Sequence, residues 1–507
     1  MANYILFSVF IAFLVSLLLW KGSKSAQKKL PPSPWKLPII GHLHHLIGTP
    51  PHHALTKLSQ KYGPLFHLQL GEIHAIVVSS PRLAKEIMRA QDVAFADRGR
   101  FLAFKIMFYN CTDVACAPYG EYWRQMRKIC TLELLSAKNV RSFGSVRQAE
   151  ALRLIRSVKA FVGPDSGPVD LTEKLTEYTS SMVVRAAFGK VSKDEQDAFL
   201  QLLEETLPYG HRFEISDLFP TLKPLHPLLS NKKGLMKIHQ KLDRMLDGIV
   251  DQYLSDNSLR SSKSSSSADP GNEDLIDVLL RIKDSNDLQL PITNNNIKAV
   301  MLDVFTGGTE TSSSTVEWAM AELISHPEVM AKLQNEIRTA LREKETAEEA
   351  DIQELGYLKS VVKETLRLHP PVPLLVPRES RQQTEIDGYI IPVKTLVFVN
   401  AWAIGRDPES WDDPESFKPE RFENSATDFT GNHFELIPFG AGRRMCPGIS
   451  FGLANVYLPL ALLLYHFDWK IPNGLNPNDL DMSETFSITA SRKNHLLLIP
   501  TVYEPSL

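Results

Sequence analysis

Cys446 lies in a segment rich in glycine and arginine, PFGAGRRMCPG at residues 438–448. Glycines let a backbone lie close to a flat ligand, and backbone N–H groups that converge on a sulfur favour the thiolate, the form that binds metals. Arg443 and Arg444 add positive charge, which we expect to lower the pKa of the thiol further. The segment therefore predicts a thiolate ligand to a metal. The alternative is a surface turn with an inert buried cysteine.

A second candidate site is the sequence GGTET at residues 307–311. It lies inside a long predicted helix that begins at residue 293 or 294 and ends at about residue 325, before His326-Pro327. Two glycines inside a helix cost roughly 1 kcal/mol each relative to alanine, so another interaction must justify them. Close helix packing, with Glu310 and Thr311 satisfied locally, explains the segment about as well as a functional role does.

Three further charged patterns could support a site. Glu364 and Arg367 are opposite charges at i and i+3 of one predicted helix, and Arg421 follows in the sequence PERF. Trp123 and Arg127 lie four residues apart on one face of another predicted helix. Each pattern taken alone is also typical of an ordinary solvated helix surface.

Composition narrows the class of partner. The 507 residues include 56 basic and 59 acidic side chains, a net charge of −3, so no overall basic field is available to attract nucleic acid. The four cysteines form no CxxC pair, which argues against a disulfide framework and fits a reducing compartment. We expect the partner to be a small molecule.

The N-terminus predicts a membrane anchor. No charged side chain occurs between residues 2 and 20, and the apolar run over residues 4–20 is about 26 Å long as a helix. Lysines follow it, so the positive-inside rule predicts a single-pass signal-anchor with the rest of the chain in the cytosol. A cleaved signal peptide is the alternative, but no basic region precedes the apolar run and no small-residue cleavage site follows it. Residues 21–41 are basic and proline-rich and predict a stiff hinge.

Residues 42–507 predict one large domain that is mainly α with small β-sheets. Apolar residues at helical spacing predict helices over 54–61, 81–89, 121–131, 145–161 and 232–253. Alternating or β-branched residues predict strands over 66–70, 75–79, 385–390 and 396–400.

These motifs resemble one family. The spacing Phe439-x-x-Gly442-x-Arg444-x-Cys446-x-Gly448 resembles the haem-binding loop of the cytochrome P-450 superfamily. GGTET resembles its oxygen-groove motif, and the hinge, the Trp123 helix, ExxR and PERF follow the family order over residues 31–448. The phrases WRQMRKIC and ISFGLANVYLPLA look like plant microsomal members of the 71 clan, and in particular its D-type subfamily, which contains many terpenoid hydroxylases.

The resemblance implies a cytochrome P-450 fold, a haem b cofactor and roles for individual residues. Cys446 would be the axial ligand to iron, and Glu310 and Thr311 would form the proton path. The haem would also contact Phe439, Gly440, Gly448 and the propionate partners Trp123, Arg127, Arg378 and Arg444. Glu364, Arg367 and Arg421 would form an ion network beneath the ligand loop.

The resemblance also implies where a substrate would lie, namely beside residues 100–117, 207–213, 300–305, 372–375 and 486–488. The side chains that we single out there are Phe101, Phe104, Met107, Val304, Phe305, Leu374 and Phe486. Their apolar character favours a bulky lipophilic substrate, although each also suits an ordinary core.

The implied activity is a haem-thiolate monooxygenase that uses dioxygen and hydroxylates a lipophilic plant metabolite. The chain has no flavin or nicotinamide fingerprint, so electrons would come from NADPH-cytochrome P-450 reductase, with cytochrome b5 as a further donor. We expect Arg124, Lys128 and Arg443 to help dock the acidic reductase surface. The expected location is the endoplasmic reticulum membrane.

A terpenoid is the favoured substrate, with an indole-type alkaloid or a flavonoid as alternatives. Two other classes remain open. The first is a haem-thiolate isomerase or dehydratase that does not use dioxygen, and the second is a non-catalytic membrane scaffold. The acid–threonine pair at residues 310–311 argues against both.

Overall fold

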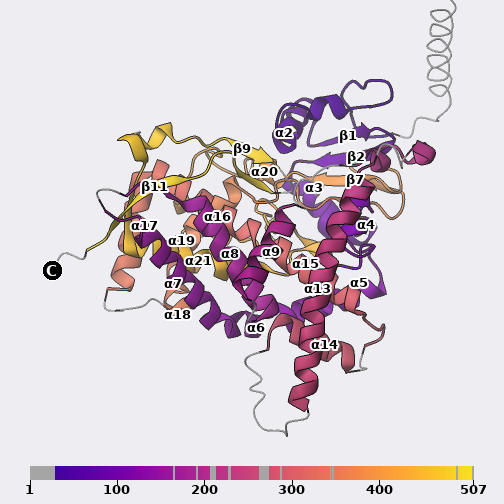
Figure 1. Ribbon diagram of the computed structural model, residues 1–507. Coiled ribbons are helices and arrows are strands. Elements are labelled where there is room, and N and C mark those ends of the chain that lie inside the picture. The colour runs from indigo at the N-terminus through magenta and orange to yellow at the C-terminus, as the bar shows by residue number, and fades with distance from the viewer. Residues whose placement is uncertain are drawn as a thin grey trace, which may run out of the picture.

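The computed structural model describes residues 29–163, 166–189, 192–205, 213–225, 230–261, 273–285, 288–342, 344, 348–474, 476–486 and 489–504. Helices make up most of this body, and small sheets lie toward its edges (Figure 1). The longer helices are α2 (Pro51–Tyr62), α5 (Glu121–Ile129), α7 (Gly144–Lys159), α8 (Leu171–Phe188), α9 (Lys193–Glu204), α13 (Lys232–Ser261), α14 (Leu275–Asp284), α15 (Asn294–Gly308), α16 (Glu310–Ser325), α17 (Pro327–Ala340), α19 (Gly356–Leu368) and α21 (Ile449–His466).

The largest sheet pairs strands from the N-terminal part of the chain with strands from residues 378–399. Its strand order is β1 (Leu65–Leu70), β2 (Ile73–Val78), β7 (Leu396–Val399) and β4 (Arg378–Glu379). β1 and β2 form an antiparallel hairpin, whereas β2 pairs in parallel with β7, more than 300 residues later in the chain. In Figure 1 these strands lie together at the upper right, next to α2 and α3 (Pro81–Lys85). Both faces carry buried apolar residues, so the sheet is fixed in the core.

Three smaller sheets complete the β-structure. One has the order β3 (Val169–Asp170), β11 (Leu497–Val502) and β8 (Phe467–Lys470). The other two are the hairpins of β5 (Thr384–Ile386) with β6 (Tyr389–Ile391) and of β9 (Glu484–Phe486) with β10 (Ala490–Arg492). The prediction of a helical domain with small sheets is confirmed.

The main core lies where α7, α8, α16, α19 and α21 meet. Trp318 of α16 is fully buried, and the ring of His369, just after α19, stacks on it at 3.9 Å between ring centroids. α21 is the one helix of the described residues that is long and apolar enough to cross a membrane. Because α21 packs on α16, α7 and α17, it is a core helix of this domain.

Two predicted elements differ in detail from the structure. The predicted strand 385–390 is a hairpin, because Asp387 and Gly388 adopt positive φ angles of 52° and 76° and turn the chain. The predicted helix 293–325 begins with a capping box at Thr293 and ends at Ser325, but Thr309 interrupts it between α15 and α16.

The predicted membrane anchor, residues 1–20, lies outside the described residues, as does the basic part of the hinge up to residue 28. The proline-rich part is described, and it is fixed to the first sheet. The His67 N–H donates to the Pro32 carbonyl at 2.7 Å, and the His42 ring lies 2.9 Å from the Pro34 carbonyl.

Candidate functional site

The loop around Cys446 is held by its own backbone and by an earlier segment. The Cys446 N–H donates to the Phe439 carbonyl at 3.0 Å, and the Gly448 N–H donates to the Cys446 sulfur at 3.3 Å. Gly442 has a φ of +68°, and a Cβ there would lie 1.9 Å from the Met88 carbonyl. Glycine is therefore required where the loop docks on residues 88–92.

The charges around the sulfur differ from the prediction. Burial raises the pKa of the Cys446 thiol, and the Gly448 N–H and the positive charge of Arg127 act in the opposite direction. The expectation that Arg443 and Arg444 lower this pKa is wrong. The Arg444 guanidinium donates to the carbonyls of Ala96, Val114 and Ala117, and Arg443 lies near Asp92.

The junction of α15 and α16 has two glycines with different roles. A Cβ on Gly308 would lie 3.0 Å from Val183, so close packing with α8 explains this glycine. A Cβ on Gly307 would meet no atom of the described residues within 4 Å, so among these residues Gly307 borders open space. The Thr311 hydroxyl donates to the Gly307 carbonyl at 2.6 Å. The acid–threonine segment therefore starts a new helix beside an open volume.

The same junction packs on the helix that follows the cysteine loop. A Cβ on Gly308 would lie 3.6 Å from Phe451, and a Cβ on Gly452 would lie 3.9 Å from the Ser312 hydroxyl. Phe451 and Gly452 are in the first turn of α21, a few residues after Cys446. α16 and α21 thus bring residues 308–312 next to the segment that carries the thiol.

Glu364, Arg367 and Arg421 form one buried ion network. Both carboxylate oxygens of Glu364 accept from Arg367, each at 2.7 Å, and Oε1 also accepts from Arg421 at 3.0 Å and from the Lys418 N–H at 2.8 Å. The Arg367 guanidinium also donates to the carbonyls of Gly405, Pro414 and Ser416. The network ties α19 to the loop over residues 405–421.

Three of the four predicted propionate partners, Trp123, Arg378 and Arg444, already donate hydrogen bonds to protein groups. The Trp123 indole N–H donates to the Val114 carbonyl at 2.9 Å, and the Arg444 guanidinium lies 4.3 Å from the Trp123 ring. Arg378 donates to Asp92 at 2.7 Å and to the Ala441 carbonyl at 2.6 Å. Of the four predicted residues, Arg127 is the one whose charge lowers the pKa of the Cys446 thiol, against the effect of burial.

Arg98, which no sequence pattern predicted, completes a cluster of three buried arginines with Arg378 and Arg444. Arg98 donates to the carbonyls of Ala115, Val376 and Pro377. Burial and the charges of the other two arginines lower the pKa of Arg98, and burial with the charge of Arg378 lowers that of Arg444 to about 10. RGR at residues 98–100 has no periodic or motif signal that marks it as buried.

This cluster provides a test of fit for haem. Within the described part of the chain, neither Arg98 nor Arg444 has an ion-pair partner, and Arg378 has only Asp92. Buried cations are stable when anions accompany them, and guanidinium groups suit carboxylates well. The residues present therefore match a ligand that has carboxylate groups at one edge and that holds a metal able to bind a thiolate.

The predicted substrate residues divide into two groups. Phe101 packs edge-on against Phe104 and Phe213, in the cluster that holds Leu374. Met107, Val304 and Phe305 belong to a second cluster, where Phe305 contacts Phe199 at 4.8 Å between ring centroids. The side chain of Phe486 and residues 206–212 and 487–488 lie outside the described residues.

A pair of buried acids, Asp113 and Asp303, was also missed. Asp303 of α15 accepts from the Val114 N–H at 2.6 Å, and Asp113 accepts from the Cys116 N–H at 2.8 Å. Burial raises the pKa of Asp113 to about 6, and burial with the nearby Asp113 charge raises that of Asp303. Asp303 thereby ties the loop over residues 109–117 to α15.

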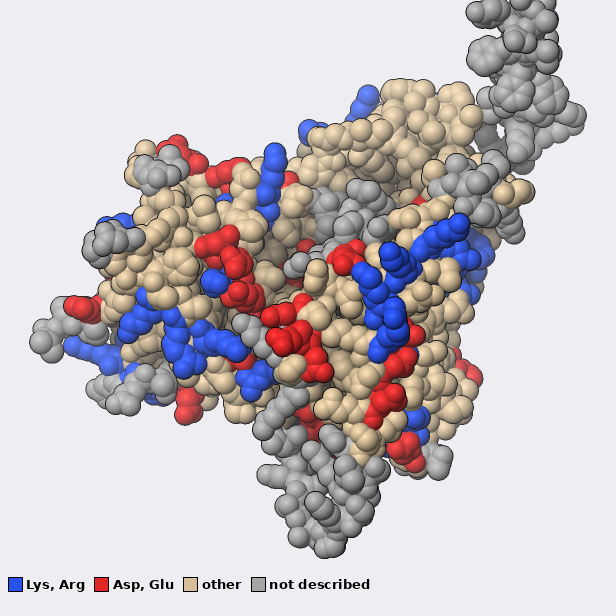
Figure 2. All heavy atoms as spheres, in the orientation of Figure 1, with Lys and Arg blue, Asp and Glu red and all other residues tan. Residues whose placement is uncertain are grey.

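The residues predicted to dock a reductase are accessible. The side chains of Arg124 and Arg443 are about half exposed, and Lys128 is exposed one turn after Arg124 on α5. Figure 2 shows basic and acidic side chains in separate small groups on the face that it presents, including a basic row along α13. No single charge covers this face, in keeping with the near-neutral sequence.

A helix-rich body that presents a lone half-buried thiol beside buried arginines is typical of haem-thiolate proteins. The family model described as Cytochrome P450 matches residues 31–498, so the chain belongs to the cytochrome P450 family. It is an oxidoreductase of the P450 monooxygenase class.

The relatives are plant enzymes. Premnaspirodiene oxygenase of Hyoscyamus muticus is 56 % identical over 98 % of both chains. 5-Epiaristolochene 1,3-dihydroxylase of Nicotiana tabacum is 54 % identical over 98 % of both chains. Among solved structures, a zebra fish cytochrome P450 determined with progesterone has a TM-score of 0.75 and 26 % identity, over 90 % of this chain and all of that one. The predicted family and plant 71D-type lineage are confirmed.

Proposed function

We propose that this protein hydroxylates a lipophilic plant terpenoid, with haem b held by Cys446. The observation that carries the proposal is the identity of 56 % and 54 %, over nearly the whole chain, to relatives named premnaspirodiene oxygenase and 5-epiaristolochene 1,3-dihydroxylase. A third relative, at 51 %, is named germacrene A hydroxylase. All three names describe oxidation of a terpenoid.

The residues around the thiol support this chemistry. When bound, the haem would supply the iron that activates dioxygen with electrons from a partner protein. Cys446 would hold it on one side, and Arg98, Arg378 and Arg444 would neutralise its carboxylates. Gly307 leaves open volume beside Thr311, whose hydroxyl can leave the Gly307 carbonyl to donate a proton. Glu310, in the same turn, would supply that proton from solvent.

Attachment to the endoplasmic reticulum membrane, with reductase as the electron donor, is part of the proposal. Five large apolar side chains are exposed near the point where the described chain begins, namely Trp35, Leu37, Ile39, Ile40 and Ile47. Exposed apolar groups of this size are typical of surfaces that contact a membrane or a partner. They follow directly on the apolar N-terminal segment and its lysines.

The test is the difference spectrum of the reduced protein with carbon monoxide, for wild type, Cys446→Ser and the control Cys111→Ser. We expect the thiolate Soret band in wild type and in Cys111→Ser, and its loss in Cys446→Ser. Retention of the band in Cys446→Ser would contradict thiolate ligation by this residue.

The same preparations test the substrate class. A sesquiterpene hydrocarbon, an indole alkaloid and a flavonoid are titrated separately, and the spin-state shift and NADPH-dependent product are measured with reductase. We expect a shift and a hydroxylated product with the terpenoid. If only the alkaloid or only the flavonoid gave a product, that compound class and not the terpenoid would be assigned as the substrate. Turnover without dioxygen and reductase would indicate an isomerase or dehydratase, and no turnover with any substrate would favour a scaffold.

A further inference from the structure

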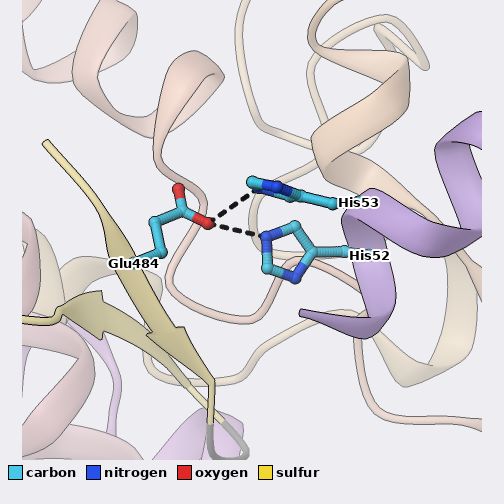
Figure 3. A group of neighbouring side chains, drawn as sticks. All are labelled: His52, His53 and Glu484. Carbon is cyan, nitrogen blue, oxygen red and sulfur yellow. Dashed lines mark hydrogen bonds and ion pairs between the residues drawn. The ribbon is translucent and has the colours of Figure 1, made fainter. Parts of the chain in front are cut away.

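Two adjacent histidines at the start of α2 point at one carboxylate oxygen from the C-terminal end of the chain (Figure 3). His52 Nε2 lies 2.7 Å and His53 Nε2 lies 3.1 Å from Oε2 of Glu484 in β9. His52 is fully buried and the Glu484 side chain is 8 % exposed, whereas His53 is 34 % exposed. Three potential ligand atoms thus lie within 4.8 Å of one another at the edge of the core.

A third histidine faces the same carboxylate. His369 Nε2 lies 2.6 Å from Glu322 Oε1, and its ring is fixed by stacking on Trp318. Its other nitrogen, Nδ1, is buried and has no hydrogen-bond partner in the part of the chain that the structure describes, and it lies 3.8 Å from Glu484 Oε1, too far for a hydrogen bond. A histidine that donates one N–H to a carboxylate and presents its other nitrogen is the usual arrangement of a metal-bound histidine.

The cluster opens onto a cavity, so an ion can reach it. A cavity of about 610 Å³ is lined by His53, Glu484, His369, Glu322, His326 and Arg406, among others. Tetrahedral ligands at zinc–nitrogen distances of about 2.0–2.1 Å lie roughly 3.3 Å from each other. The His53–Glu484 distance of 3.1 Å then requires an expansion of about 0.2 Å and the His52–Glu484 distance of 2.7 Å one of about 0.6 Å. A shift of the Glu484 carboxylate toward the cavity that it lines supplies this expansion.

We propose that His52, His53 and Glu484 bind a divalent transition-metal ion of the zinc class, with His369 Nδ1 or a water molecule from the cavity as the fourth ligand. Imidazole nitrogens with one carboxylate suit zinc, whereas calcium and magnesium prefer oxygen ligands. The bound ion joins α2 to β9, two elements more than 400 residues apart in the chain. This site is separate from the Cys446 loop, and its role is structural.

The experiment uses untagged holoenzyme that has been dialysed against a chelator. Zinc is titrated in competition with a chromophoric zinc indicator, for wild type, His53→Ala and Glu484→Gln. The matched control is His433→Ala, because the His433 side chain is also 34 % exposed and lies 3.3 Å from a glutamate, Glu435, but has no second histidine.

We expect one tight zinc equivalent in wild type and in His433→Ala, and affinity weaker by about tenfold or more in the other two variants. Zinc should raise the unfolding temperature of wild type and not that of His53→Ala. Zinc-edge X-ray absorption should show nitrogen and oxygen ligands at about 2.0–2.1 Å with scattering from at least two imidazoles.

The proposal is overturned if wild type binds zinc no more tightly than His53→Ala. It is also overturned if His53→Ala lowers the unfolding temperature equally with and without zinc, because the cluster is then only a hydrogen-bonded contact. Circular dichroism identifies a variant that fails to fold. Should Glu484→Gln be one, His53→Ala at the exposed side of the cluster decides the result.

Discussion

Replacing Glu364 by glutamine tests the buried ion network. The carboxylate has no exposed surface and accepts four hydrogen bonds, from Arg367 twice, from Arg421 and from the Lys418 N–H. Glutamine preserves the shape and one acceptor oxygen. Its NH2 group, however, would face the Arg367 Nε–H, donor against donor, and the negative charge between two guanidinium groups would be lost.

Removing one partner of a buried ion pair costs about 3–5 kcal/mol, because the other charge stays buried and unpaired. An exposed pair is worth about 0–1 kcal/mol. Lys332 provides that comparison, since its pairs with Glu420 and Glu423 are 39–48 % exposed. We therefore expect Glu364→Gln to destabilise the protein by at least 2 kcal/mol more than Lys332→Gln does.

Thermal unfolding followed by circular dichroism measures this difference, with loss of the carbon monoxide thiolate band followed in parallel. In a domain of this size, a cost of 3–5 kcal/mol corresponds to a fall of roughly 3–5 °C in the unfolding midpoint, and Lys332→Gln should change it by about 1 °C or less. Loss of the thiolate band before loss of helicity would place the network beneath the cysteine loop. Equal midpoints for the two variants would refute the reasoning.

Three further outcomes are expected. Thr311→Val should lower product formed per NADPH by about a hundredfold, and Thr311→Ser should restore most of it; equal product from the valine variant would remove Thr311 from the proton path. Asp303 holds its proton longer when folded than when unfolded, so its contribution is full at low pH and is lost as pH rises through its folded pKa. Asp303→Asn, which can still accept from the Val114 N–H, should therefore gain stability relative to wild type as pH rises above about 4, and a difference in unfolding temperature that stays constant with pH would contradict this. Reversing the charges of Arg124 and Lys128 should weaken reductase affinity and its salt dependence, and unchanged kinetics would exclude this docking surface.

The features predicted well from sequence are those with local signals. The ends of the helix over residues 293–325 follow from a Thr293 cap and from His326-Pro327, and both are local. The network partner Arg421 was found because its motif follows the ExxR helix at the family distance. The alternating or β-branched residues over 66–70 and 75–79 likewise predicted two strands, which the structure has as β1 and β2.

What the sequence did not reveal depends on contacts between distant segments. Arg98 is buried because carbonyls at residues 115, 376 and 377 converge on it, and no local pattern encodes that convergence. Arg444 was expected to lower the pKa of the Cys446 thiol, but its guanidinium donates instead to three carbonyls from residues 96–117. The cluster of His52, His53 and Glu484 could not be predicted, since its members come together only in the folded chain.

The contacts between residues 88–117 and residues 441–446 form late in synthesis, because the two segments are far apart in the chain. Asp92 and Ala117 leave the ribosome some 330–350 residues before Arg443 and Arg444, which donate hydrogen bonds to them. At about 5–20 residues per second, roughly 20–70 s pass between the two events. During that interval Arg98 and Asp92 have neither their arginine neighbours nor the cysteine loop. On the proposed ligation by Cys446, haem can be held only after this loop has been synthesised, and the edge of β2 that pairs with β7 stays unpaired until β7 has been synthesised.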